Sequence, residues 1–216
     1  MTKQAKSEEE ALTGGRVVRL YCHIRGIVPC IMANGAMADP TYFWAKEARR
    51  IRDSVKRGSV MTEEVANLYY HALFMGQLYL ADGEKTPHWP AENVEGMIRR
   101  GAMRSKKGPL AKICITVCGE TPDEIFPLIY DGPCSGEELW SDGRFTFKSR
   151  IGGKNGTTIN CRPRFPQWEF KFSLLLDREV ADIAQLGTWL TDAGRFIGLS
   201  AWTPKWGRFE VVSVRK

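Results

Sequence analysis

The sequence predicts an α+β protein in which helices cover one face of an antiparallel sheet, and two patterns predict it. Apolar and polar residues alternate from Trp168 to Leu176, as in a strand with one buried face. Apolar residues recur every three or four positions from Trp44 to Val55 and from Val94 to Ala102, as on the buried side of a helix. Because strands and helices do not alternate strictly, the plan is α+β rather than a parallel α/β sheet.

A first strand and a group of helices account for the first half of the chain. Residues 15–33 are rich in β-branched side chains and predict a strand bent at Gly26, with a turn at residues 34–40. One helix ends at Gly58, and a second begins at Thr62, a residue suited to cap it. We expect residues 77–80 to form a short strand and residues 91–108 a third helix. The expected inward side chains of the second helix are Val65, Leu68, Tyr69 and Ala72.

Strands dominate the second half. Residues 111–118 read as a buried strand, and the acidic residues 120–143 as a loop containing one short strand at residues 125–130. An asparagine-glycine turn predicts a hairpin of residues 145–151 and 157–164. After the strand at residues 168–176, a helix is expected from Asp177 to Ile197, and a closing strand from Phe209.

This order of elements fits a ferredoxin-like core with a helical insertion after the first strand. We therefore expect one domain over residues 15–216, with the insertion at about residues 41–108, preceded by a disordered leader at residues 1–14. The leader has no apolar segment typical of a secretory signal, and no apolar run approaches the ~20 residues that cross a bilayer. The prediction is a cytoplasmic protein with no membrane partner.

The six cysteines and three histidines give no metal or cofactor motif. The cysteines are scattered without a CxxC pair, so they are expected to be reduced thiols that act as small core residues. A phosphate-binding loop, a dinucleotide fingerprint and a nucleophile elbow are all missing from the sequence. We predict no cofactor and no metal.

The net charge of +6 is unevenly distributed along the chain. Residues 120–143 contain seven acidic residues and no basic one, whereas residues 144–216 contain thirteen basic and six acidic residues. Such segregation creates a local field that attracts polyanions to one part of a protein. The acidic stretch is expected either to be a solvated loop or to contact the basic surface of a neighbouring copy.

Cations from several segments form the candidate binding surface for nucleic acid, because cations neutralise phosphates and aromatic rings stack on unpaired bases. A charged helix face that is simply solvated is the alternative interpretation. The candidate residues are Arg49, Arg50, Arg52, Arg99, Arg100, Arg104, Lys106, Lys107, Arg162, Arg164, Lys205 and Arg208, with Trp202 and Trp206 as stacking rings.

The segment from Ile197 to Val214 combines two glycines with a basic, aromatic loop. Gly198 and Gly207 are expected to shape this loop, since glycine adopts left-handed backbone angles and permits close approach. Lys205 and Arg208 lie between or beside them as the expected binding cations. Trp206 is equally compatible with a core position and with base stacking.

This loop, IGLSAWTPKWGRFEV, resembles the C-terminal glycine-rich loop of the repeat-associated mysterious protein (RAMP) superfamily, which includes backbone and crRNA-processing subunits of CRISPR effector complexes. Two further stretches are similar to those backbone subunits: IRGIVPCIMANGAMADP at residues 24–40 and HWPAENVEGMIRRGAMRSKKG at residues 88–108. The chain, including NCRPRFPQWEF at residues 160–170, also resembles a small family common in tailed bacteriophages and prophages. The loop departs from the pattern at Ser200, Ala201 and Trp206, where glycine is usual.

The resemblance implies an RRM-like core that binds single-stranded DNA or RNA and associates head to tail along it. We therefore expect a non-enzymatic nucleic-acid-binding protein encoded by a phage and acting in the host cytoplasm. One alternative is a phage inhibitor that imitates a CRISPR backbone subunit.

A metal-independent endoribonuclease is the second alternative, because relatives that cleave repeat RNA use a histidine as general base, a role that suits its pKa. His23, His71 and His88 are the candidates, yet none lies at a convincing sequence spacing from a lysine or tyrosine. We expect no catalytic residue.

Overall fold

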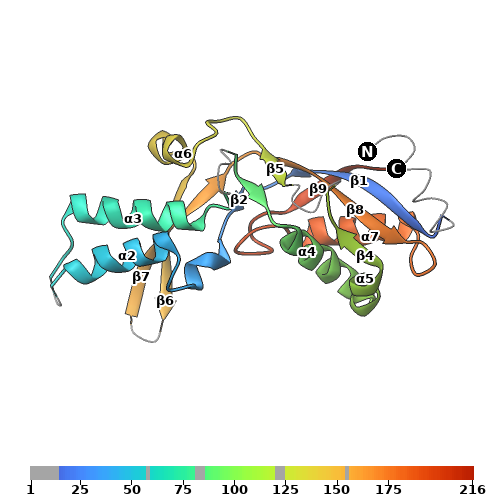
Figure 1. The fold of residues 1–216 in the computed structure, drawn as a ribbon, viewed down its shortest axis with the longest axis horizontal. Coiled ribbons are helices and arrows are strands. Elements are labelled where there is room, and N and C mark those ends of the chain that lie inside the picture. The colour runs from blue at the N-terminus through green and yellow to red at the C-terminus, as the bar shows by residue number, and fades with distance from the viewer. Residues whose placement is uncertain (1–14, 57–58, 81–85, 120–124, 154–155) are drawn as a thin grey trace. The chain divides into compact units, whose positions relative to one another are not determined.

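The computed structural model describes residues 15–56, 59–80, 86–119, 125–153 and 156–216 (Figure 1). The chain divides into two units. Unit 1 consists of Met1–Cys30, His88–Tyr130 and Gln167–Lys216, and unit 2 of Ile31–Pro87 and Asp131–Pro166. Each unit is therefore built from segments that are far apart in the sequence.

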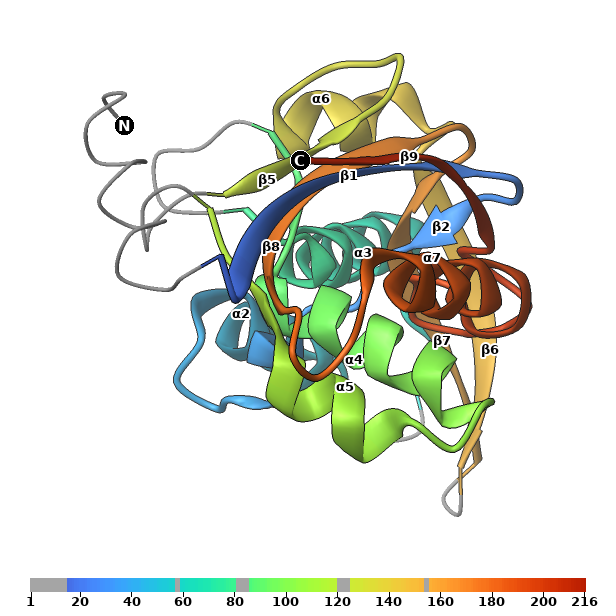
Figure 2. The same cartoon turned by 90° about the vertical axis from the view of Figure 1, so that its right-hand side faces the viewer.

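Unit 1 is organised around an antiparallel sheet with the strand order β3-β5-β8-β1-β9, in which β4 also pairs with β8. Figure 2 shows β1 between β8 and β9. The strands are β1 (Val17–Gly26), β3 (His88–Trp89), β4 (Ile115–Val117), β5 (Phe126–Ile129), β8 (Glu169–Asp177) and β9 (Phe209–Arg215).

Helices cover one face of this sheet. They are α4 (Ala91–Met103), α5 (Gly108–Cys114) and α7 (Ile183–Asp192), the last continued by the π-helical turn η2 (Ala193–Ile197). In Figure 2, α4 and α7 lie on one side of β1, β8 and β9. Leu20, Cys22 and Ile24 of β1 are at most 2% exposed, whereas Tyr21 between them is 39% exposed. This alternation identifies the covered and the open face, and the α+β prediction is confirmed.

Unit 2 combines a helical hairpin with a second, three-stranded sheet (Figure 1). The helices are η1 (Gly35–Ala38), α2 (Phe43–Ser54), α3 (Glu63–Gln77) and α6 (Gly136–Asp142). The sheet has the order β2-β7-β6, with β2 (Cys30–Ile31) at the passage between the units, β6 (Thr146–Gly153) and β7 (Gly156–Phe165). Helix α3 packs against both α2 and β7.

The boundaries of unit 2 differ from those of the predicted insertion at residues 41–108. Helix α4, predicted within the insertion, belongs to unit 1, where Val94, Met97, Ile98 and Ala102 are buried as expected. Close approach to α7 explains this placement, because a Cβ on Gly101 would lie 2.3 Å from the Trp189 carbonyl oxygen. The β6–β7 hairpin, predicted outside the insertion, belongs to unit 2.

Several predicted boundaries in unit 1 are wrong. Residues 111–118 begin within helix α5, and only Ile115–Val117 forms a strand, because Pro109 at the start of α5 favours a helical turn. The helix expected from Asp177 begins six residues later, where Asp182 caps it by accepting a hydrogen bond from the Gln185 amide at 2.7 Å.

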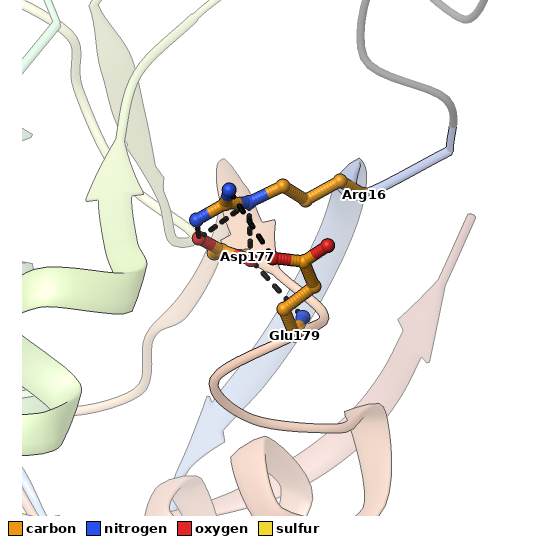
Figure 3. Close-up of polar contacts among 3 residues, drawn as sticks. All are labelled: Arg16, Asp177 and Glu179. Atoms are coloured by element: carbon orange, nitrogen blue, oxygen red, sulfur yellow. Dashed lines mark hydrogen bonds and ion pairs between the residues drawn. The ribbon is translucent and has the colours of Figure 1, made fainter.

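Asp177 instead pairs with the start of β1. Figure 3 shows the Arg16 side chain directed at Asp177 and Glu179. The Arg16 guanidinium donates to Asp177 at 2.7 Å and lies 3.1 Å from a Glu179 carboxylate oxygen. These hydrogen bonds from Arg16 lower the pKa of Asp177. The pairs join the beginning of β1 to the end of β8, its antiparallel partner.

Unit 2 also departs from expectation at three places. Residues 77–80 form no strand, because two of their carbonyl groups bond to Asn34 instead of to a neighbouring strand. The Asn34 main-chain amide donates to the Gln77 carbonyl group at 3.2 Å, and its side-chain amide donates to the Leu78 carbonyl group at 2.9 Å. Leu68, expected to point inward, is 59% exposed, and Phe74 is fully buried instead. The acidic stretch contains α6, which the reciprocal hydrogen bonds of Ser135 and Glu138 cap.

The cysteines form no disulfide, and all six lie in the described part of the chain. Cys22, Cys30, Cys114 and Cys161 are buried. Burial raises the pKa of Cys22 and Cys161 to about 12, so these thiols are protonated at neutral pH.

Candidate nucleic-acid interface

The last turn of α4 and the residues after it form a cluster of cations in unit 1. We name this the α4-end cluster, and it consists of Arg99, Arg100, Arg104, Lys106 and Lys107, all exposed. Within the described ranges, no carboxylate forms an ion pair with any of the five. Cations at a helix C-terminus complement the helix dipole, but that effect is confined to the last turn. The charges of this cluster are therefore available to a ligand.

Arg104 connects the α4-end cluster to η2. Its guanidinium carbon lies 3.9 Å from the ring centroid of Phe196, a side chain that is 45% exposed. A stacked guanidinium keeps its edge donors free to contact phosphate. Gly198 follows Phe196 by two residues, so the α4-end cluster lies beside the start of the glycine loop.

Lys106 adopts a backbone conformation that lysine rarely takes. Its φ is +59°, and the Lys107 amide donates to the Ala102 carbonyl group at 2.9 Å, as in the helix ending that usually has glycine at this position. A lysine here adds a cation to the cluster at the cost of left-handed strain.

The glycine loop is held by backbone contacts that leave no room for a side chain. Gly198 and Gly207 have φ values of +87° and +75°. A Cβ on Gly207 would lie 2.3 Å from the Leu199 carbonyl oxygen. The amides of Leu199 and Gly207 donate to the Gly207 and Pro29 carbonyl groups at 2.8 and 2.9 Å. These contacts fix the loop, which carries the exposed Lys205.

The other predicted residues of the loop are less accessible than Lys205. Trp202, Trp206 and Arg208 are partly buried. The Arg208 carbonyl group accepts from the Ile27 amide at 2.9 Å, which holds this end of the loop against the end of β1. Each tryptophan retains some exposed surface, so its ring could both pack against the protein and stack on a base.

The predicted nucleic-acid-binding cations of unit 2 differ from one another in burial and in the groups they contact. Arg50 donates to Glu47 at 2.7 and 2.9 Å, and Arg52 donates to Asp53 at 3.1 Å. The hydrogen bond to Glu47 raises the pKa of Arg50. Arg49 is exposed on α2. On β7, Arg162 is half-buried with a pKa lowered by burial, and Arg164 donates to the Arg144 carbonyl group at 3.0 Å.

The predicted basic surface is thus distributed over both units. Arg99, Arg100, Arg104, Lys106, Lys107, Lys205 and Arg208 belong to unit 1, and Arg49, Arg50, Arg52, Arg162 and Arg164 belong to unit 2. Within unit 1, the α4-end cluster and the glycine loop are connected through η2. We therefore treat the two sets as separate candidate surfaces.

Three described carboxylates of the acidic stretch have local partners. Glu137 lies 3.0 Å from His71, Glu138 caps α6, and Asp142 pairs with Arg144 at 2.7 Å. Residues 120–124 of this stretch lie outside the described residues.

His23 has neighbours that sequence spacing did not suggest. Its Nε2 atom lies 2.6 Å from Glu169, and Lys171 on β8 is its direct cross-strand partner. Tyr21, two residues earlier, points to the same open face. Sequence spacing does not reveal these neighbours, because antiparallel pairing joins residues 148 positions apart in the sequence. The register of β1 and β8 was the missing information.

No protein-family model matches the chain, and the curated proteins include no match to it. No helix within the described ranges is long and apolar enough to cross a membrane. Across those same ranges, no three histidine, cysteine, aspartate or glutamate side chains are grouped so as to hold a metal ion.

Proposed function

We propose that the protein is a non-enzymatic single-stranded nucleic-acid-binding protein that contacts the phosphate backbone through the α4-end cluster. The observation that carries this proposal is the set of five exposed cations without carboxylate partners among the described residues. Phosphates neutralised by such cations release counterions, which supplies affinity without sequence preference. DNA and RNA are both compatible with this chemistry.

Single strands are favoured over duplexes because aromatic side chains flank the cations. Phe196 is 45% exposed beside Arg104, and Trp202 and Trp206 lie partly exposed in the adjoining loop. Stacking requires unpaired bases, which a duplex does not offer.

The topology of unit 1 supports the resemblance to RAMP proteins. A helix lies between β1 and β4, another lies between β8 and β9, and β1 and β8 are adjacent and antiparallel. This arrangement supports a ferredoxin-like, RRM-like core of the split βαβ type. We accordingly propose a phage-encoded, RAMP-like protein that acts in the host cytoplasm and associates head to tail on its ligand.

A salt series tests the proposal. Fluorescence anisotropy with labelled single-stranded DNA, single-stranded RNA and duplexes should give the tightest binding for a single strand. The logarithm of affinity should fall with the logarithm of salt concentration, with a slope of about −0.7 for each phosphate neutralised. A slope near zero, or no binding at low salt, would overturn the proposal. Binding to CRISPR subunits without nucleic acid would favour the inhibitor alternative.

The pairing of His23 with Glu169 and its position opposite Lys171 favour one further candidate, a metal-independent endoribonuclease. A carboxylate that orients a histidine and a cation nearby are the parts that general acid–base chemistry uses. Labelled hairpin RNA incubated with the wild-type protein and His23→Ala in the presence of a chelator tests this candidate. Intact RNA with the wild-type protein would remove it.

A further inference from the structure

The open face of the unit 1 sheet presents three cross-strand rows of polar side chains. Each row contains one residue of β8, one of β1 and one of β9, and antiparallel register places them side by side. The rows are Ser173–Tyr21–Arg215, Lys171–His23–Ser213 and Glu169–Arg25–Glu210. None of these residues belongs to the surfaces predicted from the sequence.

The charges of the third row are paired with one another. Arg25 lies 2.8 Å from Glu169 and 3.7 Å from Glu210, and His23 lies 2.6 Å from the other Glu169 oxygen. The hydrogen bond from Arg25 lowers the pKa of Glu169. This row therefore forms a closed, negative boundary at one end of the face.

The first two rows carry two exposed cations, whereas Ser173 of the first row is buried. Lys171 and Arg215 are exposed, and neither forms an ion pair with a carboxylate of the described residues. Tyr21 is 39% exposed between them. A cavity of about 440 Å³ is lined by Tyr21, His23, Lys171, Ser173, Ser213 and Arg215, together with parts of Cys22, Phe126 and Phe172.

The cavity lies where β8 lacks a continuous neighbour on one side. β4 pairs with Leu174–Leu176, and β5 pairs with Glu169 and Phe170. Lys171 and Ser173 lie on the portion of β8 between these two pairings. The volume of the cavity is within the range of sites that hold small organic ligands.

We propose that this cavity binds one nucleotide of a single-stranded chain, with the phosphate on Lys171 and Arg215 and the base against the Tyr21 ring. Two cations suit a phosphate, an aromatic ring suits an unstacked base, and the Ser213 hydroxyl offers a hydrogen bond to sugar or base. The carboxylate of Glu169 at the boundary disfavours a second phosphate beyond the first. The inference rests on the proposed function and adds a second contact area to the α4-end cluster.

Substitutions on the open face test the site through binding of a labelled single-stranded 20-mer. Tyr21→Ala should weaken binding by about tenfold, whereas Tyr21→Phe, which keeps the ring, should weaken it less than about threefold. Lys171→Ala combined with Arg215→Ala should lower the salt slope by about 1.4. The matched control, Arg178→Ala combined with Lys46→Ala, removes two exposed cations outside both surfaces and should leave affinity within about twofold. Thermal melting checks that each variant is folded.

A photocrosslink gives a readout independent of affinity. A 20-mer containing 5-iodouracil, irradiated on the wild-type protein, should form an adduct on the peptide containing Tyr21, and excess uridine monophosphate should compete with it. Adducts only elsewhere, together with control-like binding by the open-face variants, would overturn this site while leaving the proposed function intact. A wild-type protein that binds no oligonucleotide would overturn both.

Discussion

Helix α2 in unit 2 and the end of α4 in unit 1 are both rich in arginine, but their arginines differ in ion pairing. Arg50 and Arg52 on α2 bind carboxylates one or three residues away. Arg99, Arg100 and Arg104 on α4 have no such partner within the described ranges. Two segments with similar charge density thus offer a polyanion different numbers of unpaired cations.

The reason lies in the partners that the neighbouring carboxylates take. On α2, Glu47 lies three positions before Arg50, a separation at which helix side chains meet. On α4, Glu95 lies four positions before Arg99, but it accepts a hydrogen bond from the Val117 amide instead. Counting charges along the sequence therefore overstates the binding capacity of α2 relative to α4.

The largest effect on binding is expected when the three arginines of α4 are replaced, and the three arginines of α2 provide the comparison. Arg99→Ala, Arg100→Ala and Arg104→Ala together should weaken binding to a single-stranded 20-mer by about 100-fold at low salt and reduce the salt slope by about 2. Arg49→Ala, Arg50→Ala and Arg52→Ala together should weaken it by less than about fivefold. Equal losses in the two variants, measured by anisotropy, would break the comparison.

The second prediction concerns the glycine loop beside the α4-end cluster. Gly207→Ala should destabilise the protein by about 2–3 kcal/mol, because φ is +75° and the added Cβ would lie 2.3 Å from a carbonyl oxygen. The control is Gly96→Ala on α4, where no atom lies within 4 Å of an added Cβ. It should be neutral or stabilise by up to about 1 kcal/mol. Urea unfolding distinguishes the two, and equal stabilities would contradict the described loop backbone.

Two substitutions of Lys106 distinguish the contribution of its charge to binding from the cost of its backbone conformation to stability. Lys106→Gly and Lys106→Ala should weaken nucleic-acid binding to the same extent, about two- to threefold, because each removes one cation. Lys106→Gly should nevertheless be more stable than Lys106→Ala by about 1 kcal/mol, because only glycine takes φ near +59° without cost. A stability difference near zero, measured by chemical unfolding, would show that the left-handed conformation is not maintained.

The smallest expected effect tests ion pairing on α2 directly. Glu47→Gln should release Arg50 and increase affinity for a single strand by about twofold at low salt. Glu64→Gln on α3, an exposed acid in the same unit with no ion pair among the described residues, controls for the change in net charge. If both variants gain affinity equally, carboxylate pairing does not explain the weakness of α2.

The sequence predicted the fold class and much of the element order because these follow from local periodicity. The alternating strand at residues 168–176 and the buried face of α4 were both predicted from single patterns. Residues 111–118 were wrongly assigned because a short apolar run fits helix and strand alike. Helix α6 was missed although Ser135 and Glu138 have capping-box spacing.

The candidate sites were harder to predict because they depend on which residues meet. The segment from Arg99 to Lys107 is local, so its cations were identified from the sequence. The open face depends on the register of β1 with β8 and β9, which brings Tyr21 beside Ser173 and Arg215. No pattern within a single strand contains that information. Ion pairing on α2 was visible in the spacing of Glu47 and Arg50, but it requires the helix to be recognised first.

Nucleic acid retained during purification at low salt is the most direct measure of the central claim. The wild-type protein should elute with a raised ratio of absorbance at 260 nm to that at 280 nm, and nuclease treatment should identify the retained strand as DNA or RNA. The variant without Arg99, Arg100 and Arg104, prepared in parallel, should elute with the ratio of protein alone. A wild-type protein free of nucleic acid, or a variant that retains as much as the wild type, would contradict binding through the α4-end cluster.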